Sequence, residues 1–168
     1  MAAKRQMVIF KVGAEEFALD IMDLKEVVVM RSITAVPETE DFVEGVMNLR
    51  GSLVPVLDLR KRLRAAGVGD AQEMRIIVSN LEGRLVGLIV DGASEVIRVS
   101  EEMIEPAPDI IVEMGVAYVT GIINLKTRFI TMIDLKKALT EEITRELEEV
   151  TKVLSIQNNV SSSIRAIQ

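Results

Sequence analysis

Carboxylates are the first residues to consider for chemistry, because the chain contains no histidine and no cysteine. Acid–base or nucleophilic catalysis would therefore depend on carboxylates, Lys, Ser, Thr or the single Tyr. Asp58 and Asp134 occupy equivalent positions in an internal repeat and could form the carboxylate pair of a hydrolase. Each, however, ends a strand-like run and is followed by basic residues, a pattern typical of an aspartate that caps a turn. We expect no catalytic residues and no enzymatic activity.

Composition argues against several further classes of function. The sequence has no GxxxxGK[ST] phosphate loop and no cluster of residues with metal-ligand spacing, so we expect no cofactor and no metal. The formal net charge of −6 argues against a nucleic-acid partner, which would require a basic surface. No apolar stretch approaches about 18 residues, and the N-terminus has no signal-peptide pattern. We expect a cytoplasmic protein that does not insert into a membrane.

Arg50 is the polar residue with the best case for binding another protein. It lies in Asn48-Leu49-Arg50-Gly51, at the tip of a predicted hairpin, close to the small and apolar residues Gly45 and Val46. A charged residue at a tight turn is usually just solvated. A rigidly held Arg on an apolar surface, by contrast, often anchors an interface, because its planar guanidinium can pair bidentately with a carboxylate.

The hairpin that carries Arg50 belongs to a segment that the chain uses twice. Residues 42–63 (FVEGVMNLRGSLVPVLDLRKRL) align without a gap with residues 118–139 (YVTGIINLKTRFITMIDLKKAL) at an offset of 76 residues. Gly45 matches Gly121, and Arg50 matches Lys126. Matches this dense predict one supersecondary unit in two small modules related by a pseudo-twofold axis. Burial is expected to be deepest at Val46, Leu57, Ile89, Ile122 and Ile133.

The rest of the chain shows the pattern of an all-β protein followed by one helix. Short runs rich in Val and Ile alternate with polar or Gly-bearing turns. Residues 15–27 and 83–96 correspond more loosely, with a one-residue slip that aligns Glu26-Val27 with Glu95-Val96. The polar connector 65–72 divides the two halves. Helical spacing of apolar residues predicts an amphipathic helix over 140–156, and 157–168 form a polar tail.

The string FVEGVMNLRGSLVPVLDLR (42–60) resembles the signature of the CheW family, the coupling proteins of bacterial chemotaxis. The likeness extends over roughly residues 6–139, in the family's order, through VIFKVGAEEFALDIMDLKEVV, ITAVP, RIIVSN, VGLIVDGASEVIRV, IEPAP and YVTGIINL. It implies an all-β fold of two intertwined five-stranded SH3-like barrels with a shared core, here with an added C-terminal amphipathic helix. Residues 1–139 would form the domain, with a first barrel at roughly 13–72, a second at roughly 73–139, and an N-terminal strand that could join either.

The resemblance also implies a function, which is not catalytic. Proteins of this family bridge the cytoplasmic tips of chemoreceptors (methyl-accepting chemotaxis proteins) to the histidine kinase CheA, whose regulatory domain has the same fold. The chain would then act in the cytoplasm, at membrane-associated receptor arrays. Two alternatives share the fold, a detached kinase regulatory domain and a receiver-fused coupling protein. We expect neither, because no kinase ATP-binding region precedes the chain and no phosphoacceptor domain follows it. The third alternative is the hydrolase built on Asp58 and Asp134.

Several residues match positions that matter in this family. Glu26 and Arg50 match an acidic–basic pair needed for coupling and kinase control, and Gly45 and Gly51 match glycines that flank this Arg at the kinase-facing end. The receptor tip would pack in a groove between the barrels, expected to be lined by Ile21, Val27, Gly87, Ala93 and Val96. Ala93 departs from the Val that often occupies its position. Lys126 lacks the bidentate fork of Arg50, so we expect the working anchor on the first hairpin.

Overall fold

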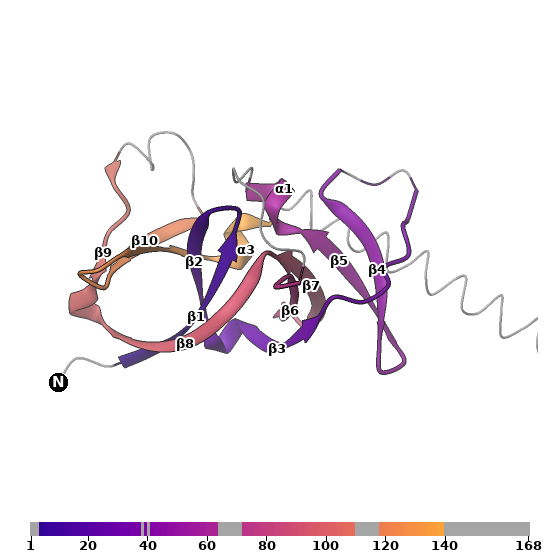
Figure 1. The fold of residues 1–168 in the computed structure, drawn as a ribbon, viewed down its shortest axis with the longest axis horizontal. Coiled ribbons are helices and arrows are strands. Elements are labelled where there is room, and N and C mark those ends of the chain that lie inside the picture. The colour runs from indigo at the N-terminus through magenta and orange to yellow at the C-terminus, as the bar shows by residue number, and fades with distance from the viewer. Residues whose placement is uncertain (1–3, 38, 40, 64–71, 110–117, 140–168) are drawn as a thin grey trace, which may run out of the picture.

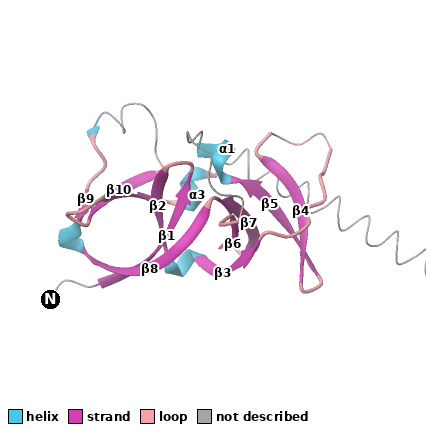
Figure 2. Ribbon diagram, viewed as in Figure 1, coloured by secondary structure: helices cyan, strands magenta, loops and turns pink. Residues whose placement is uncertain are grey.

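The structure is a computed structural model that describes residues 4–37, 39, 41–63, 72–109 and 118–139. The described residues are mainly β structure, arranged in two sheets (Figures 1 and 2). The five-stranded sheet, which we call the central barrel, contains β3 (Leu24–Val29), β4 (Val43–Leu49), β5 (Ser52–Asp58), β6 (Arg75–Leu81) and β7 (Arg84–Val90). The six-stranded sheet, the terminal barrel, contains β1 (Lys4–Val12), β2 (Glu15–Asp20), β8 (Gly92–Ser100), β9 (Ile104–Glu105), β10 (Val119–Asn124) and β11 (Phe129–Ile133).

Short helical segments connect the strands. A 3-10 turn, η1 (Ile21–Asp23), links β2 to β3, and a second, η2 (Glu101–Met103), links β8 to β9. The helix α1 (Leu59–Leu63) follows β5, and α3 (Leu135–Ala138) follows β11. None of the helices in the described residues is long and apolar enough to cross a membrane. The predicted helix 140–156 and the polar tail 157–168 lie outside the described residues.

The expected division of the chain near residue 72 is wrong for the sheets. β6 and β7 continue the sheet that holds β3, β4 and β5, so the central barrel runs from residue 24 to residue 90. β1 and β2 join β8–β11 in the other sheet, with β2 parallel to β11. Within the described residues, the chain crosses between barrels twice, from β2 to β3 and from β7 to β8. These crossovers make the two barrels intertwined, and they leave no composition change that would mark them in the sequence.

The predicted repeat is confirmed as the same hairpin in both barrels. β4–β5–α1 and β10–β11–α3 each contain a register shift at the equivalent place, beside Gly45 and beside Gly121. The backbone N–H of Asp58 donates to Phe42 O at 2.7 Å, and that of Asp134 donates to Tyr118 O at 2.8 Å. Both pairs of residues differ by the predicted offset of 76, which gives the molecule its pseudo-twofold relation.

The looser correspondence of the other strands is confirmed as well. Val27 on β3 pairs with Ile77 on β6, and Val96 on β8 pairs with Val8 on β1. Val96 lies 69 residues after Val27, and Ile77 lies 69 residues after Val8, as the one-residue slip predicts. β3 and β8 are therefore equivalent strands, each placed in a barrel by the crossover that precedes it.

One apolar core joins the two barrels. Phe10 and Leu19 from the terminal barrel pack with Leu57, Ile77 and Leu88 from the central barrel, and all five are fully buried. Each barrel also has a smaller core of its own. The shared core predicted from the family resemblance is thus present, and its burial is the main force that holds the barrels together.

The predicted burial holds at four of five positions. Val46, Leu57, Ile89 and Ile133 are buried, whereas Ile122 is only partly buried and Ile123 is the fully buried residue of β10. The prediction for Ile122 is wrong. Strand pairing does not explain the difference, because Val46 is paired with Thr34 and with β5, and Ile122 is likewise paired with Glu105 of β9 and with Thr131 of β11.

Candidate protein-interaction sites

Arg50 stands at the tip of the β4–β5 hairpin and is held there by Glu26. Its backbone has a positive φ of 50°, and its Nη2 donates to Glu26 Oε2 at 2.6 Å. Glu26 lies on β3 and Arg50 directly follows β4; these are the edge strands of the five-stranded sheet, so the ion pair connects its two ends. Asn48 Oδ1 accepts from the backbone N–H of Gly51 at 2.8 Å and fixes the turn. The structure brings the predicted acidic–basic pair together.

The pair leaves most of the arginine available to another molecule. The hydrogen bond from Arg50 lowers the pKa of the Glu26 carboxyl, and the same bond raises the pKa of the guanidinium. The Arg50 side chain nevertheless remains 67% exposed. Glu26 therefore orients a guanidinium that keeps room for a second carboxylate.

Gly45 and Gly51 are glycines for different physical reasons. Gly45 has φ 142°, and a Cβ there would lie 2.0 Å from the backbone oxygen of Thr34, so the close approach of the Thr34 segment excludes a side chain. Gly51 has φ 89° in the turn, and a Cβ there would meet nothing within 4 Å. Gly45 is thus required by packing inside the barrel, whereas Gly51 leaves open space directly beside Arg50.

Val27 and Val96 are the exposed members of the predicted receptor groove. They are 39% and 52% exposed, on the equivalent strands β3 and β8. Ile21 is partly buried in η1, at the crossover from β2 to β3. Its neighbour Met22 is 85% exposed and was not predicted from the sequence. The available signal was a Met between two apolar runs.

Gly87 does not line a surface. It is buried in β7, and a Cβ there would lie 3.0 Å from Ile76 Cγ2 and 3.2 Å from Met47 Cε. Its parallel-strand partner is Val56, also inside the central barrel. The prediction that Gly87 belongs to an open groove is therefore wrong, and the residue is a glycine because the core of this barrel has no room for a side chain.

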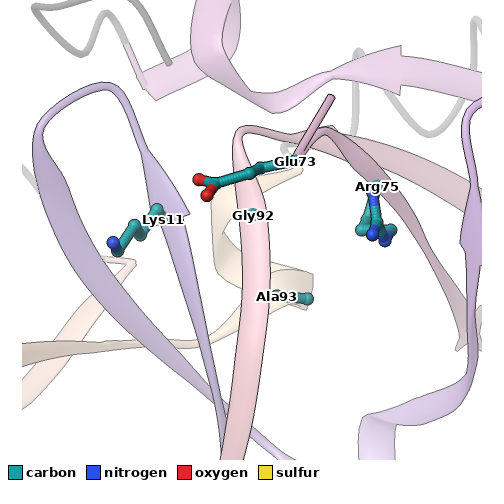
Figure 3. Close-up of a pocket in the computed structure, with 5 residues that line it drawn as sticks. All are labelled: Lys11, Glu73, Arg75, Gly92 and Ala93. Carbon is teal, nitrogen blue, oxygen red and sulfur yellow. The ribbon is translucent and has the colours of Figure 1, made fainter. Parts of the chain in front are cut away.

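Ala93 borders a small polar hollow (Figure 3). The hollow has a volume of about 250 Å³ and is lined by Lys11, Glu73, Arg75, Gly92 and Ala93. In Figure 3 the Glu73 side chain extends past Gly92 toward Lys11. Ala93 itself is partly buried against the shared core. Its surroundings therefore differ from those of the exposed aliphatic residues Val27 and Val96.

A larger hollow next to Met22 carries several acidic groups. Its volume is about 450 Å³, and Asp20, Asp23 and Asp134 are among the residues that line it. Partial burial, followed by repulsion from Asp20 and Asp134, raises the pKa of the Asp23 carboxyl. Arg5 neutralises part of this charge through an ion pair with Asp20 at 3.1 Å. The crossover into β3 is thus bordered by negative potential.

The second hairpin has an acidic–basic pair that the sequence analysis missed. Lys126 occupies the position equivalent to Arg50 and also has a positive φ, of 70°. The residue that pairs with Glu95, the equivalent of Glu26, is however Arg128, which also contacts Glu16 at 3.4 Å. The two hairpins have the same register, so Arg128 stands at the position equivalent to Ser52, two residues beyond Lys126.

Asp58 and Asp134 act as caps, as the turn pattern predicts. Asp58 Oδ1 accepts from the backbone N–H of Arg60 at 2.9 Å, and Asp134 Oδ1 accepts from that of Lys137 at 3.2 Å. Asp58 is buried, and both of its oxygens are hydrogen-bonded to the Arg60 side chain. A carboxylate held in this way is poorly placed to act as a nucleophile or base, so the hydrolase hypothesis has no support at this residue.

Comparison with known proteins assigns the family. The profile of the CheW-like domain matches residues 6–160. The chemotaxis protein CheW of Klebsiella aerogenes is 36% identical over 148 residues, which cover 88% of this chain and 89% of that protein. The chemotaxis protein CheW of Bacillus subtilis is 35% identical over 137 residues, covering 82% and 88%.

A solved structure agrees with the sequence comparison. The crystal structure of the scaffolding protein TtCheW from Thermoanaerobacter tengcongensis superposes with a TM-score of 0.75 at 38% identity. The match covers 84% of this chain and 96% of that one. With the duplicated hairpin, the intertwined barrels and the paired Glu26 and Arg50 in place, the chain belongs to the CheW-like family of chemotaxis proteins.

Proposed function

We propose that this chain is a non-catalytic chemotaxis adaptor that couples the cytoplasmic tips of chemoreceptors to the histidine kinase CheA. The observation that carries the proposal is the exposed Arg50 guanidinium, oriented by Glu26 at the tip of a rigid hairpin in a CheW-like fold. The related protein from Thermoanaerobacter tengcongensis is described as a scaffolding protein, which agrees with a role in assembly. We place the chain in the cytoplasm, at membrane-associated receptor arrays.

The kinase-facing surface is the hairpin tip around Arg50. A preoriented guanidinium loses little conformational entropy when it binds, so it can form a bidentate pair with a carboxylate of the CheA regulatory domain. Gly51 supports this assignment because the space beside its Cα is open. A partner backbone can therefore approach the arginine closely.

The receptor-facing surface is formed by the aliphatic residues near the crossovers. Val27 and Val96 project from equivalent strands of different barrels, with Ile21 and Met22 at the adjacent turn. Exposed aliphatic side chains of this kind suit the apolar face of a helical receptor tip. Their burial in a complex supplies the binding free energy, at about 25 cal/mol per Å² of apolar surface.

Reconstitution with the chemoreceptor and CheA from the same source tests the proposal. Receptor-containing membranes are mixed with CheA, with and without this chain, and CheA is followed both in the membrane pellet and by autophosphorylation. We expect the chain to bring CheA to the membranes and to place its activity under ligand control. If the membrane pellet contained the same amount of CheA with and without the chain, this result would contradict the adaptor function.

A further inference from the structure

Arg60 lies between two buried carboxylates at the junction of the barrels. Its Nε and Nη2 donate to Asp58 Oδ1 and Oδ2 at 3.0 and 2.9 Å, and its Nη1 is 3.5 Å from Asp91 Oδ1. The carboxylates are only 2% and 3% exposed. The hydrogen bonding of Arg60 to the Asp58 carboxylate is the main reason why the pKa of the Arg60 guanidinium is raised. Asp58, Arg60 and Asp91 form what we call the junction network.

Asp91 connects this network to the other barrel. It is the residue between β7 of the central barrel and β8 of the terminal barrel. Its Oδ2 accepts from the backbone N–H of Gly13, in the β1–β2 turn, at 2.6 Å, and its own N–H donates to Lys11 O at 2.8 Å. Polar contacts therefore run without a break from the end of β5, through Arg60 and Asp91, to the terminal barrel.

Among the residues that the structure describes, the equivalent positions at the other crossover form no such network, and the ion pair nearby, between Arg5 and Asp20, is partly exposed. The repeat places Asp134, Lys136 and Met22 at the positions that correspond to Asp58, Arg60 and Asp91. Met22 is highly exposed and has no carboxylate to offer, and Lys136 pairs with Glu82 on the surface at 2.7 Å. One of two symmetry-related crossovers is therefore fixed by buried ionic contacts, and the other, through η1, has no such contacts at these positions.

Adhesion between the barrels does not explain this arrangement. The shared apolar core already joins them, and burying charges involves a desolvation penalty that apolar residues of similar size would avoid. Apolar packing has little directionality, whereas hydrogen bonds and ion pairs are directional. Asp58 holds the Arg60 guanidinium bidentately within the central barrel, Arg60 pairs with Asp91, and Asp91 is hydrogen-bonded to the β1–β2 turn of the terminal barrel. The network is thus suited to setting geometry more than to adding stability.

We propose that the junction network is a positioning device that fixes the angle between the two barrels. β8 begins directly after Asp91, so this angle determines where Val96 stands relative to Val27, which lies in the other barrel. Arg60 is thus a positioning residue for the receptor-facing surface, a part of the inference that rests on the proposed function. The kinase-facing tip lies wholly in the central barrel, so a change in the angle between the barrels leaves its own geometry unaltered.

The angle can be measured without any partner. The chain has no cysteine, so Ser52→Cys and Thr127→Cys place spin labels on the two hairpin turns, which lie toward opposite ends of the molecule (Figure 1). Double electron–electron resonance then reports the distribution of distances between the barrels. Asp58→Asn, Arg60→Met and Asp91→Asn are combined, because removing all three charges together leaves no unpaired buried charge. We expect the distribution to become at least about twofold broader.

Two further variants keep the test decisive. Lys136→Met removes the surface pair at the equivalent position and should leave the width unchanged. Arg60→Lys retains the charge but loses the fork, and it should broaden the distribution to an intermediate extent even if the triple variant fails to fold. An unchanged width in both junction variants, or equal broadening in Lys136→Met, would overturn the positioning role.

Binding measurements on unlabelled protein connect the angle to function. We expect the triple variant to bind a chemoreceptor tip fragment about tenfold more weakly while its affinity for the CheA regulatory domain changes by less than about twofold. Equal losses for both partners would mean that the network only supports folding, which contradicts the inference. Wild-type protein that binds neither partner would overturn the proposed function instead, and the distance measurement would still stand.

Discussion

Arg50 owes its proposed role to the residue that orients it. Two other non-glycine turn residues, Glu82 and Lys126, share its positive φ, so an unusual backbone alone does not distinguish it. Lys136 pairs with Glu82 on the surface, but a lysine offers no planar fork to a partner. Arg50 combines a fixed orientation with an exposed fork, and we expect its loss to affect binding more than folding.

Substitution of the pair tests this expectation. Arg50→Ala should weaken binding to CheA by about 10- to 100-fold, as for an interface hot spot, while the melting temperature changes by no more than about 2 °C. Glu26→Ala should act in the same direction, and the double variant should lose less than the sum of the single losses because the residues act as one unit. Lys126→Ala is the matched control. If Lys126→Ala severely weakened CheA binding and Arg50→Ala did not, the working surface would lie on the terminal barrel, and the assignment to Arg50 would be wrong.

The ionisation of Glu26 offers a second test at this scale. Its pKa in the folded chain lies below the ordinary 4.5, so the ion pair contributes stability above that value and loses it as the pH falls through the folded pKa. Carboxyl resonances followed by NMR between about pH 2 and 7 should give Glu26 a depressed pKa in the wild type. In Arg50→Ala the pKa should move up toward 4.5. The same Glu26 pKa in both proteins would contradict a formed pair.

The elements show where sequence patterns were informative and where they were not. The β4–β5 and β10–β11 hairpins were predicted because their residues repeat one for one. Membership of β6 and β7 in the central barrel was not, since a crossover depends on contacts between distant strands and not on local pattern. Gly87 was misplaced for the same reason. A glycine against a tightly packed core and a glycine on a groove look alike in a sequence.

Glycine substitutions distinguish packing from open space within the hairpins. Gly45→Ala should destabilise the fold by about 2–4 kcal/mol, because the new Cβ would collide with the Thr34 backbone and φ is strained. Gly51→Ala should cost only about 1 kcal/mol, since strain remains but nothing is nearby. Gly121→Ala is the pseudo-twofold control, with a milder contact of 3.0 Å to Glu105 O. Urea denaturation measures all three, and equal losses for Gly45→Ala and Gly51→Ala would exclude this explanation.

At the scale of the whole molecule, the duplicated fold presents two unlike surfaces. The repeat gives both barrels the same hairpin, yet Arg50 pairs with Glu26 at one tip and stays largely exposed, while Arg128 contacts both Glu95 and Glu16 at the other. The sequence indicated the duplication, and the choice of the Arg50 tip as the working surface stays a prediction. The sequence could not indicate the pair formed by Arg128, because residues from β2, β8 and the β10–β11 turn meet there only after folding.

Val96 tests the receptor-facing surface at this scale. Val96→Glu places a charge on an exposed aliphatic position, so far-UV circular dichroism should be unchanged while affinity for a receptor tip falls by more than about tenfold. Phe129→Glu is the control, because Phe129 is an exposed apolar residue elsewhere, on β11. Unchanged receptor affinity in Val96→Glu would remove the groove assignment.

The central claim is that one small fold carries two separate docking surfaces. The most direct measurement titrates wild type, Arg50→Ala and Val96→Glu against the CheA regulatory domain and against a receptor tip fragment, giving six dissociation constants. The account predicts that Arg50→Ala weakens only CheA binding and that Val96→Glu weakens only receptor binding. If each variant weakened both partners equally, or neither variant changed either constant, the two surfaces would not be where the structure indicates.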